Sequence, residues 1–190
     1  MVKPDEFVRI NESETTVETA DAARKVAIAR RDDPALTHLA VVGDTYTVLL
    51  SGDQTDGRFA MLDMLIPPGG GPPPHFHDFE ECFRVLEGSI EVRVGDRALV
   101  VLEQGDSANI PANAPHSFRN AAEVEARLLC TVVPSGLEKF FAEFGDPVAT
   151  RTSLAPELSD AERVERLRIA MAKAPEYGMG FVRPPSGPEG

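Results

Sequence analysis

Residues 69 to 88 constrain the fold of this chain more than any other stretch. They read GGGPPPHFHDFEECFRVLEG, with three prolines directly before a histidine pair. Each proline fixes φ and lacks an N–H, so the approach to the histidines is not helical. On an extended strand, residues i and i+2 point to the same face. We therefore expect His75 and His77 to face one point from a strand.

Three of the chain's four histidines lie in two short stretches, and the second stretch, residues 105 to 120, contributes His116. Glu81 lies four residues after His77, so on a continuous strand its side chain would point to the same face as the histidine pair. A turn over residues 78 to 80 could interrupt this alternation. Imidazole nitrogens and a carboxylate oxygen suit a divalent first-row metal such as iron, manganese, nickel or cobalt, with zinc as a further option. The predicted metal ligands are His75, His77, Glu81 and His116.

The two stretches resemble the two cupin motifs. The first motif runs G, five residues, H-x-H, three or four residues, E, six residues, G, and its fixed positions are matched by Gly69, His75, His77, Glu81 and Gly88. The second runs G, five residues, P-x-G, two residues, H, three residues, N, and is matched by Gly105, Pro111, His116 and Asn120. The resemblance covers roughly residues 45 to 135.

Asn113 stands where the second motif has glycine, and asparagine tolerates a left-handed backbone better than most residues. A histidine pair by itself can be a surface pair on a strand, but the glutamate, the glycine spacing and the distant histidine favour a metal site. Glu80 is the rival carboxylate, and only Glu81 leaves six residues before Gly88. His38 lies outside both motifs, and we interpret it as an ordinary packed or solvated histidine.

The order of a barrel, the phenylalanine-rich segment LEKFFAEFGDP and a C-terminal helix resembles quercetin 2,3-dioxygenase-like single-domain cupins. This resemblance implies that the metal takes an aromatic substrate with adjacent oxygens and that oxygen cleaves its ring. We predict that Glu81 also acts as a catalytic base. Two alternatives stay open, namely a non-oxidative metal cupin (isomerase, lyase or polyketide-type cyclase) and a small-ligand-binding module without turnover.

From residue 39 onward, short runs rich in Val, Ile, Leu, Phe and Thr alternate with Gly, Pro and Asp breaks. The runs cover about 39–42, 45–50, 58–66, 81–86, 89–94, 97–102, 107–110, 116–119 and 126–133. Such spacing predicts an all-β sandwich or barrel. Because no internal repeat is visible, we expect one small antiparallel β-barrel of cupin or jelly-roll type. The side chains expected inside it are Phe59, Met61, Met64, Phe83, Val85, Ile110 and Phe118.

An N-terminal helix near 20–31 and two C-terminal helices near 136–144 and 160–173 are expected beside the barrel. Ser135 with Glu138 and Ser159 with Glu162 read as capping boxes. The inward faces are predicted to be Leu137, Phe140, Phe141 and Phe144 in one helix and Val164, Leu167, Ala170 and Met171 in the other. Packing is the preferred role of the phenylalanines, and a substrate-pocket wall is the alternative.

The predicted division is an arm and helix over 1–38, a barrel over 39–134, and C-terminal helices with an extended tail over 135–190. We expect the arm and tail to pair with a second copy in a homodimer. Two cysteines, Cys82 and Cys130, lie in apolar runs and are interpreted as buried inert thiols.

The net charge of the chain limits the classes of partner that it is expected to bind. Acidic residues number 31 against 19 basic ones, a formal net charge of −12, which disfavours nucleic acid and anionic membranes. The chain has no apolar run long enough to span a membrane and no apolar signal core at its start, so we expect a cytoplasmic protein. The expected partner is a small-molecule substrate.

Overall fold

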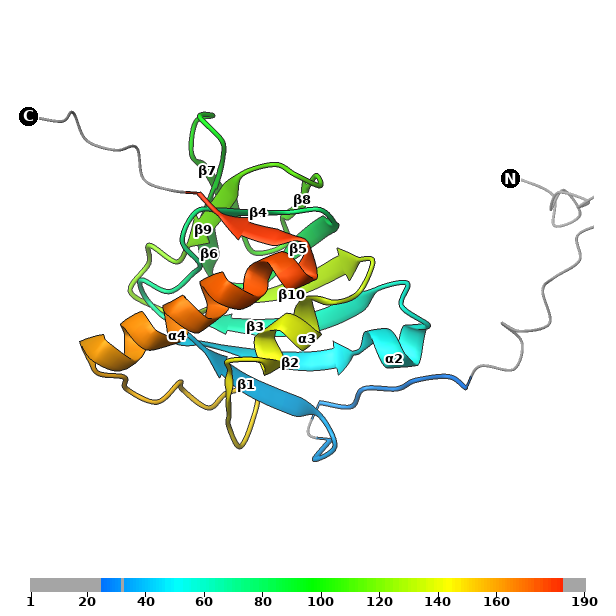
Figure 1. Ribbon diagram of the computed structural model, residues 1–190. Coiled ribbons are helices and arrows are strands. Elements are labelled where there is room, and N and C mark those ends of the chain that lie inside the picture. The colour runs from blue at the N-terminus through cyan, green and yellow to red at the C-terminus, as the bar shows by residue number, and fades with distance from the viewer. Residues whose placement is uncertain (1–24, 32, 183–190) are drawn as a thin grey trace, which may run out of the picture.

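The computed structural model describes residues 25–31 and 33–182 and shows two antiparallel β-sheets (Figure 1). The seven-stranded sheet has the order β11 (Asp146–Pro147), β1 (Thr37–Val41), β2 (Asp44–Leu50), β3 (Ala60–Ile66), β10 (Ala126–Val133), β5 (Glu80–Glu87) and β8 (Ser107–Ile110). The five-stranded sheet has the order β12 (Met179–Phe181), β4 (His75–His77), β9 (His116–Arg119), β6 (Ser89–Val94) and β7 (Val100–Glu103). The helices are α2 (Gly52–Thr55), α3 (Leu137–Ala142), α4 (Asp160–Lys173) and the 3₁₀ helix η1 (Ala174–Tyr177).

The all-β antiparallel class is confirmed, but the expected closure into a barrel is wrong. Among the described residues no strand ladder joins the two sheets. The chain instead changes sheet at turns, as at Gly88, whose φ of +71° lets β5 end and β6 begin in the other sheet. The core fills the space between the sheets, where the rings of Phe83 on β5 and Phe118 on β9 meet edge to face at 5.2 Å.

Two helices that follow the last long strand lie together in front of the first sheet in Figure 1. Both α3 and α4 fall close to their predicted ranges. The Ser159 capping box at the start of α4 is confirmed, because Ser159 and Glu162 each accept a hydrogen bond from the other's backbone N–H. The predicted capping box of Ser135 with Glu138 is wrong. The N-cap of α3 is Gly136, and the buried Glu138 carboxylate accepts hydrogen bonds from the backbone N–H groups of Gly52 and Gly136.

Three further expectations are corrected. Residues 25–31 form no helix, and the rest of the predicted 20–31 helix lies outside the described residues; Val26 is 85% exposed, so this segment has no apolar face to bury. In α4, Ala170 is buried, but Val164 and Met171 face solvent. The tail is no free arm over residues 179–181, because β12 pairs with β4.

The linker before α4 is tied to the first sheet by a buried ion cluster. Arg127 on β10 donates to Asp63 on β3 through Nε at 2.7 Å, and Arg151 of the linker donates to the same carboxylate at 3.1 Å. Thr45 Oγ donates to the carbonyl of Ser153 at 2.7 Å. The segment that leads to α4 is therefore held at a fixed place on the sheet. No helix among the described residues is long and apolar enough to cross a membrane.

The glycine stretch before the prolines packs too closely for a side chain. At Gly71, φ is +121° and a β-carbon would lie 2.2 Å from the carbonyl oxygen of Phe118. A Gly71→Ala variant is expected to lose about 1 kcal/mol or more of unfolding free energy beyond the cost of its backbone angle. Urea unfolding measures this loss.

The matched control is Gly105→Ala, because Gly105 also has a positive φ, +95°, but has open space around the added carbon. Equal losses in the two variants would contradict the proposed close packing against Phe118.

Candidate metal centre

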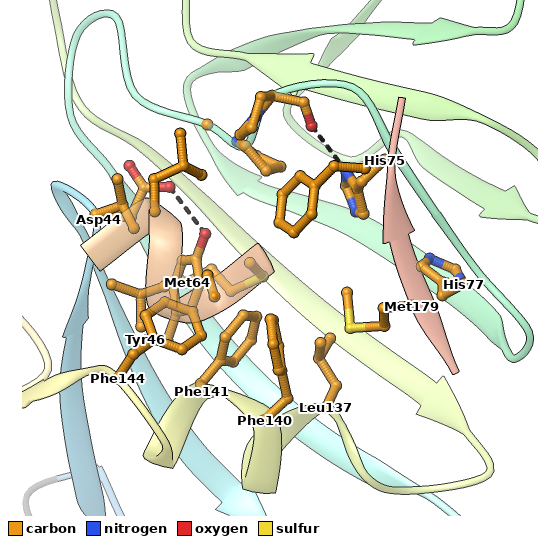
Figure 2. A pocket seen from close by; sticks show the side chains of 18 of the residues that line it. Asp44, Tyr46, Met64, His75, His77, Leu137, Phe140, Phe141, Phe144 and Met179 are labelled. Carbon is orange, nitrogen blue, oxygen red and sulfur yellow. Dashed lines mark hydrogen bonds between the residues drawn. The ribbon is translucent and has the colours of Figure 1, made fainter. Parts of the chain in front are cut away.

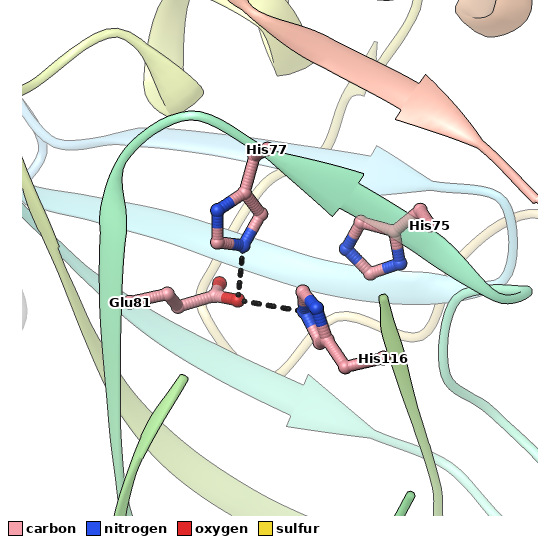
Figure 3. Close-up of side chains that lie close together, drawn as sticks. All are labelled: His75, His77, Glu81 and His116. Carbon is pink, nitrogen blue, oxygen red and sulfur yellow. Dashed lines mark hydrogen bonds and ion pairs between the residues drawn. The ribbon is translucent and has the colours of Figure 1, made fainter. Parts of the chain in front are cut away.

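The four predicted ligands converge from three strands and both sheets (Figure 3). His75 and His77 stand on β4, His116 lies opposite His75 on β9, and Glu81 comes from β5 of the other sheet. Their ligand atoms all lie within 4.8 Å of one another, and all four side chains are buried. The turn at residues 78–79 carries the chain from one sheet to the other without moving Glu81 out of reach.

Each histidine ring is oriented by a hydrogen bond from Nδ1 to a backbone carbonyl two residues away. The bonds join His75 to Pro73 at 3.0 Å, His77 to Phe79 at 2.8 Å and His116 to Ala114 at 2.9 Å. A carbonyl oxygen only accepts, so Nδ1 carries the proton in all three rings. The Nε2 lone pairs are then left for the centre of the cluster, which is the arrangement that metal-binding histidines use.

The approach of Glu81 to these nitrogens tests whether a metal ion fits. Its Oε2 lies 3.1 Å from Nε2 of His77 and 3.2 Å from Nε2 of His116. If both nitrogens offer lone pairs, acceptors face one another, and a cation between them makes this favourable. Two ligand atoms at right angles, each about 2.1 Å from one ion, lie roughly 3.0 Å apart. The donor set and its spacing therefore fit a divalent transition metal.

Burial and hydrogen bonding keep two of the ligands in their metal-binding forms. Burial, helped by the neighbouring His116, lowers the pKa of His75 to about 4, so its ring is neutral at pH 7. Burial alone would raise the pKa of Glu81, but the neighbouring His116 and His77 rings outweigh it and hold the pKa at about 2. A neutral imidazole and a carboxylate are the protonation states that ligate metals.

Side chains around the ligands fix their positions. The ring of Phe79 stacks on His77 with centroids 4.0 Å apart and planes 2° from parallel. The buried Cys130 thiol donates to Glu81 Oε1 at 3.3 Å, and burial raises its pKa well above the usual range, as expected for an inert thiol. Cys82 is exposed, against prediction, because it points outward from β5.

The two rival residues lie outside the cluster. Glu80 accepts hydrogen bonds from Asn109 Nδ2 at 2.8 Å and from the Ala112 backbone, on the outer side of β5. His38 bonds to Thr47 Oγ at 2.8 Å. The choice of Glu81 over Glu80 from the motif spacing thus agrees with the geometry.

The two motif stretches are also tied to each other through their backbones. Asn113 has φ of +64°, as expected for a residue in a glycine position, and its N–H donates to the His77 carbonyl at 2.6 Å. Asn120 donates from its backbone to Gly70 at 3.0 Å and accepts from Gly69 at 2.8 Å. Motif residues that are not ligands therefore hold β4 and β9 side by side.

An apolar cavity borders three of the four ligands, with about 700 Å³ of empty space including its mouth. Figure 2 shows Phe140 and Phe141 of α3, and Phe144 just beyond its end, at this cavity, so these residues both pack and wall a pocket. Of the seven side chains expected inside the fold, Met64 and Phe118 line the cavity; Phe83, Val85 and Ile110 are buried elsewhere, and Phe59 and Met61 are half-buried.

The lining residues that were missed by sequence reasoning include two pairs that lie outside both motifs. Asp44 and Tyr46 belong to a strand far from either motif, and Met179 and Phe181 belong to the predicted tail. Alternation along residues 44 to 48 could have indicated that Asp44 and Tyr46 share a face. Nothing in the tail sequence indicates that it pairs with β4.

Removing one ligand should empty the site. His77→Ala and His116→Ala are each expected to lower metal affinity at least a hundredfold, because every ligand here is buried and oriented. Elemental analysis of protein purified without a metal-affinity tag measures the metal content. His38→Ala is the matched control and should retain the metal; full retention in both ligand variants would refute the site.

Acid should destabilise the metal-free protein through His75. Its folded pKa of about 4 lies below the ordinary 6.5, so the unfolded chain takes up the proton first and stability falls as the pH drops from 6.5 toward 4. The full effect is about 3 kcal/mol. It is measured by urea unfolding in chelator between pH 7 and 4.5, above the range in which Glu81 titrates.

The matched variant is His75→Gln, which cannot titrate. We expect its stability to change less steeply over the same pH range than that of the wild type. Equal slopes in the two proteins would show that His75 is not held neutral by the fold.

Comparison with known proteins points to one superfamily. The family model described as the cupin domain matches residues 62–132. A quercetin 2,3-dioxygenase from Bacillus subtilis is 33% identical over 110 residues, which are 52% of this chain and 32% of that protein. The chain thus spans about a third of the length of this curated relative.

One of the similar solved structures reaches a TM-score of 0.50 and shows the same fold. An RmlC-like cupin from Shewanella frigidimarina superimposes with a TM-score of 0.50 at 18% identity, covering 60% of this chain and 96% of the other. A predicted oxalate decarboxylase from Thermotoga maritima gives a TM-score of 0.49 at 18% identity, covering 56% and 98%. With both cupin motifs in place at one buried cluster, this chain is a member of the cupin superfamily.

Proposed function

We propose that this cupin binds one divalent transition metal through His75, His77, Glu81 and His116 and acts as a dioxygenase on a small aromatic or enolic substrate. The observation that carries the proposal is the cavity that opens on the ligand cluster and is walled by aromatic side chains. The similarity to a quercetin 2,3-dioxygenase over half of the chain supports the same substrate class.

In the proposed reaction, a bound metal ion and the protein side chains would have different roles. A bound transition metal supplies Lewis acidity toward substrate oxygens and reactivity toward oxygen. His75, His77 and His116 hold their Nε2 atoms toward the ion through the Nδ1 bonds to the backbone. Glu81 is ionised at neutral pH, so its carboxylate would hold the ion together with the three rings and would be the acceptor for the proton of a substrate hydroxyl.

The cavity wall selects the substrate and excludes water. Phe140 and Phe141 of α3 and Phe144 just beyond it line the cavity together with Met179 and Phe181 of β12. Flat aromatic ligands bury a large apolar area against such rings, and offset or edge contacts add to that burial. A planar substrate with two adjacent oxygens therefore fits both the wall and the metal end.

The oligomeric state and the cellular location of the protein remain proposals. The homodimer predicted from the sequence has one support in the structure: the edge strand β7 exposes Val100 and Val101 by 53% and 52%. The cytoplasmic location and the absence of nucleic-acid partners stay predictions from the sequence.

Oxygen uptake tests the proposed activity. Protein loaded in turn with Fe(II), Mn(II), Ni(II) or Co(II) is presented with flavonols and dihydroxy-aromatics in an oxygen electrode. At least one pairing should consume oxygen above the rate of free metal. His77→Ala should abolish this rate and His38→Ala should retain it.

Other outcomes select the alternatives. No oxygen uptake with any pairing would refute the dioxygenase. Conversion of a substrate with oxygen excluded would indicate an isomerase, lyase or cyclase, and saturable binding without conversion would indicate a binding module.

A further inference from the structure

A second polar group lies in the cavity, away from the metal ligands. Asp44 and Tyr46 stand two residues apart on β2 and therefore point to the same face. Tyr46 Oη donates to Asp44 Oδ2 at 2.8 Å, and the two residues are only 4% and 3% exposed. Figure 2 shows the pair on one side of the cavity and His75 and His77 on the other.

This pair is incomplete as a structural element. The other carboxylate oxygen, Asp44 Oδ1, is buried and makes no hydrogen bond of standard geometry, although the Gly71 backbone lies close enough to the carboxyl to lower its pKa. It is the sole buried side-chain polar atom left unsatisfied in the described part of the chain. A buried acceptor without a partner costs stability, so a purely structural role leaves this group unexplained.

The backbone before Asp44 is strained in a way that places the carboxyl. The turn between β1 and β2 consists of Val42 and Gly43, with φ of +51° and +108°. A β-branched residue such as valine strongly disfavours this left-handed conformation, and such strain persists where the surrounding structure enforces it. Val42 itself lines the cavity. The strained turn therefore lies directly before Asp44, at the side of the cavity that Val42 and Asp44 both line.

Close packing also keeps room for the carboxyl. A β-carbon on Gly70 would lie 2.4 Å from Asp44 Oδ1, so only glycine fits beside it. Burial raises the pKa of Asp44 to about 7, against the opposing effects of the Tyr46 hydrogen bond and the Gly71 backbone. At neutral pH the carboxyl can accept or donate a hydrogen bond, and both suit a ligand hydroxyl.

We infer that Asp44 and Tyr46 bind a hydroxyl group of the substrate at the end of the cavity opposite the metal. The substrate is then a polyhydroxylated planar aromatic, with adjacent oxygens at the metal and a further hydroxyl at this pair. The inference rests on the proposed function for the metal end. The ring of Tyr46 contacts that of Phe141 at 4.8 Å, so the polar group sits at the margin of the aromatic wall.

Anaerobic binding to the metal-loaded protein tests the pair without turnover. The probes are 3-hydroxyflavone, galangin and quercetin, which share the metal-binding oxygens and gain hydroxyls first on the fused ring and then on the pendant ring. In the wild type, one of these two steps should tighten binding about tenfold. In Tyr46→Phe, that step should disappear, while the affinity for 3-hydroxyflavone and the metal content stay unchanged.

A fold-safe variant and a matched control complete the design. Asp44→Leu combined with Tyr46→Phe removes both polar partners at once, so no orphaned group is left buried. It should lose the same step as the single variant. Tyr177→Phe removes the chain's other phenol hydroxyl, which bonds to Glu143 outside the cavity at 2.8 Å, and should keep the wild-type series.

The outcomes separate the two proposals. A hydroxyl step of equal size in the wild type and both cavity variants would overturn the role of the pair and leave the dioxygenase standing. A step lost in the variants without oxygen uptake in the electrode would sustain the pair and refute the dioxygenase. Failure of the wild type to bind any of the three flavonols would overturn both.

Discussion

The structure depends on a carboxylate brought against imidazole nitrogens inside an apolar core. Glu81 comes from one sheet and the three histidines from the other, so both sheets must meet in one register for the cluster to form. Removing four polar side chains from water is costly unless each is paired. The Nδ1 bonds to backbone carbonyls satisfy the outer side of each ring, and a bound cation would satisfy the inner side.

The motif residues that are not ligands make this pairing rigid. Three prolines stiffen the approach to β4, so the Pro73 carbonyl that accepts from His75 stands in a fixed place. Asn113 and Asn120 join the second motif to the first through backbone hydrogen bonds. The spacing of the cupin motifs thus determines two things: which side chains face the centre of the cluster, and which backbone carbonyls orient the histidine rings.

These local constraints explain how much the sequence could predict. Strand positions follow from alternating apolar residues and glycine or proline breaks, and each of the nine predicted runs overlaps a strand. The ligand cluster follows from parity within β4 and from the motif spacing to Glu81 and His116. Closure of the barrel could not be predicted in this way, because whether edge strands such as β7 and β8 join depends on sheet twist.

Long-range packing accounts for the other errors. Glu138 has the spacing of a capping box, but its carboxylate instead accepts a hydrogen bond from the N–H of Gly52, which lies 86 positions earlier in the chain. Met179 and Phe181 look like tail residues because the strand they pair with is three residues long and follows a run of prolines. Asp44 carries no motif, and its role is visible only through the unpaired oxygen that burial makes costly.

The cavity therefore has two parts of different origin. The metal end is built from the two cupin motifs, whereas the aromatic wall comes from α3 and β12 and the distal polar pair from the β1–β2 hairpin. None of the four clustered side chains belongs to α3 or to the β1–β2 hairpin, whereas β12 pairs directly with β4, which carries His75 and His77. Under the proposed function, the hairpin and the C-terminal segment would therefore choose the substrate, and the four motif side chains would hold the ion.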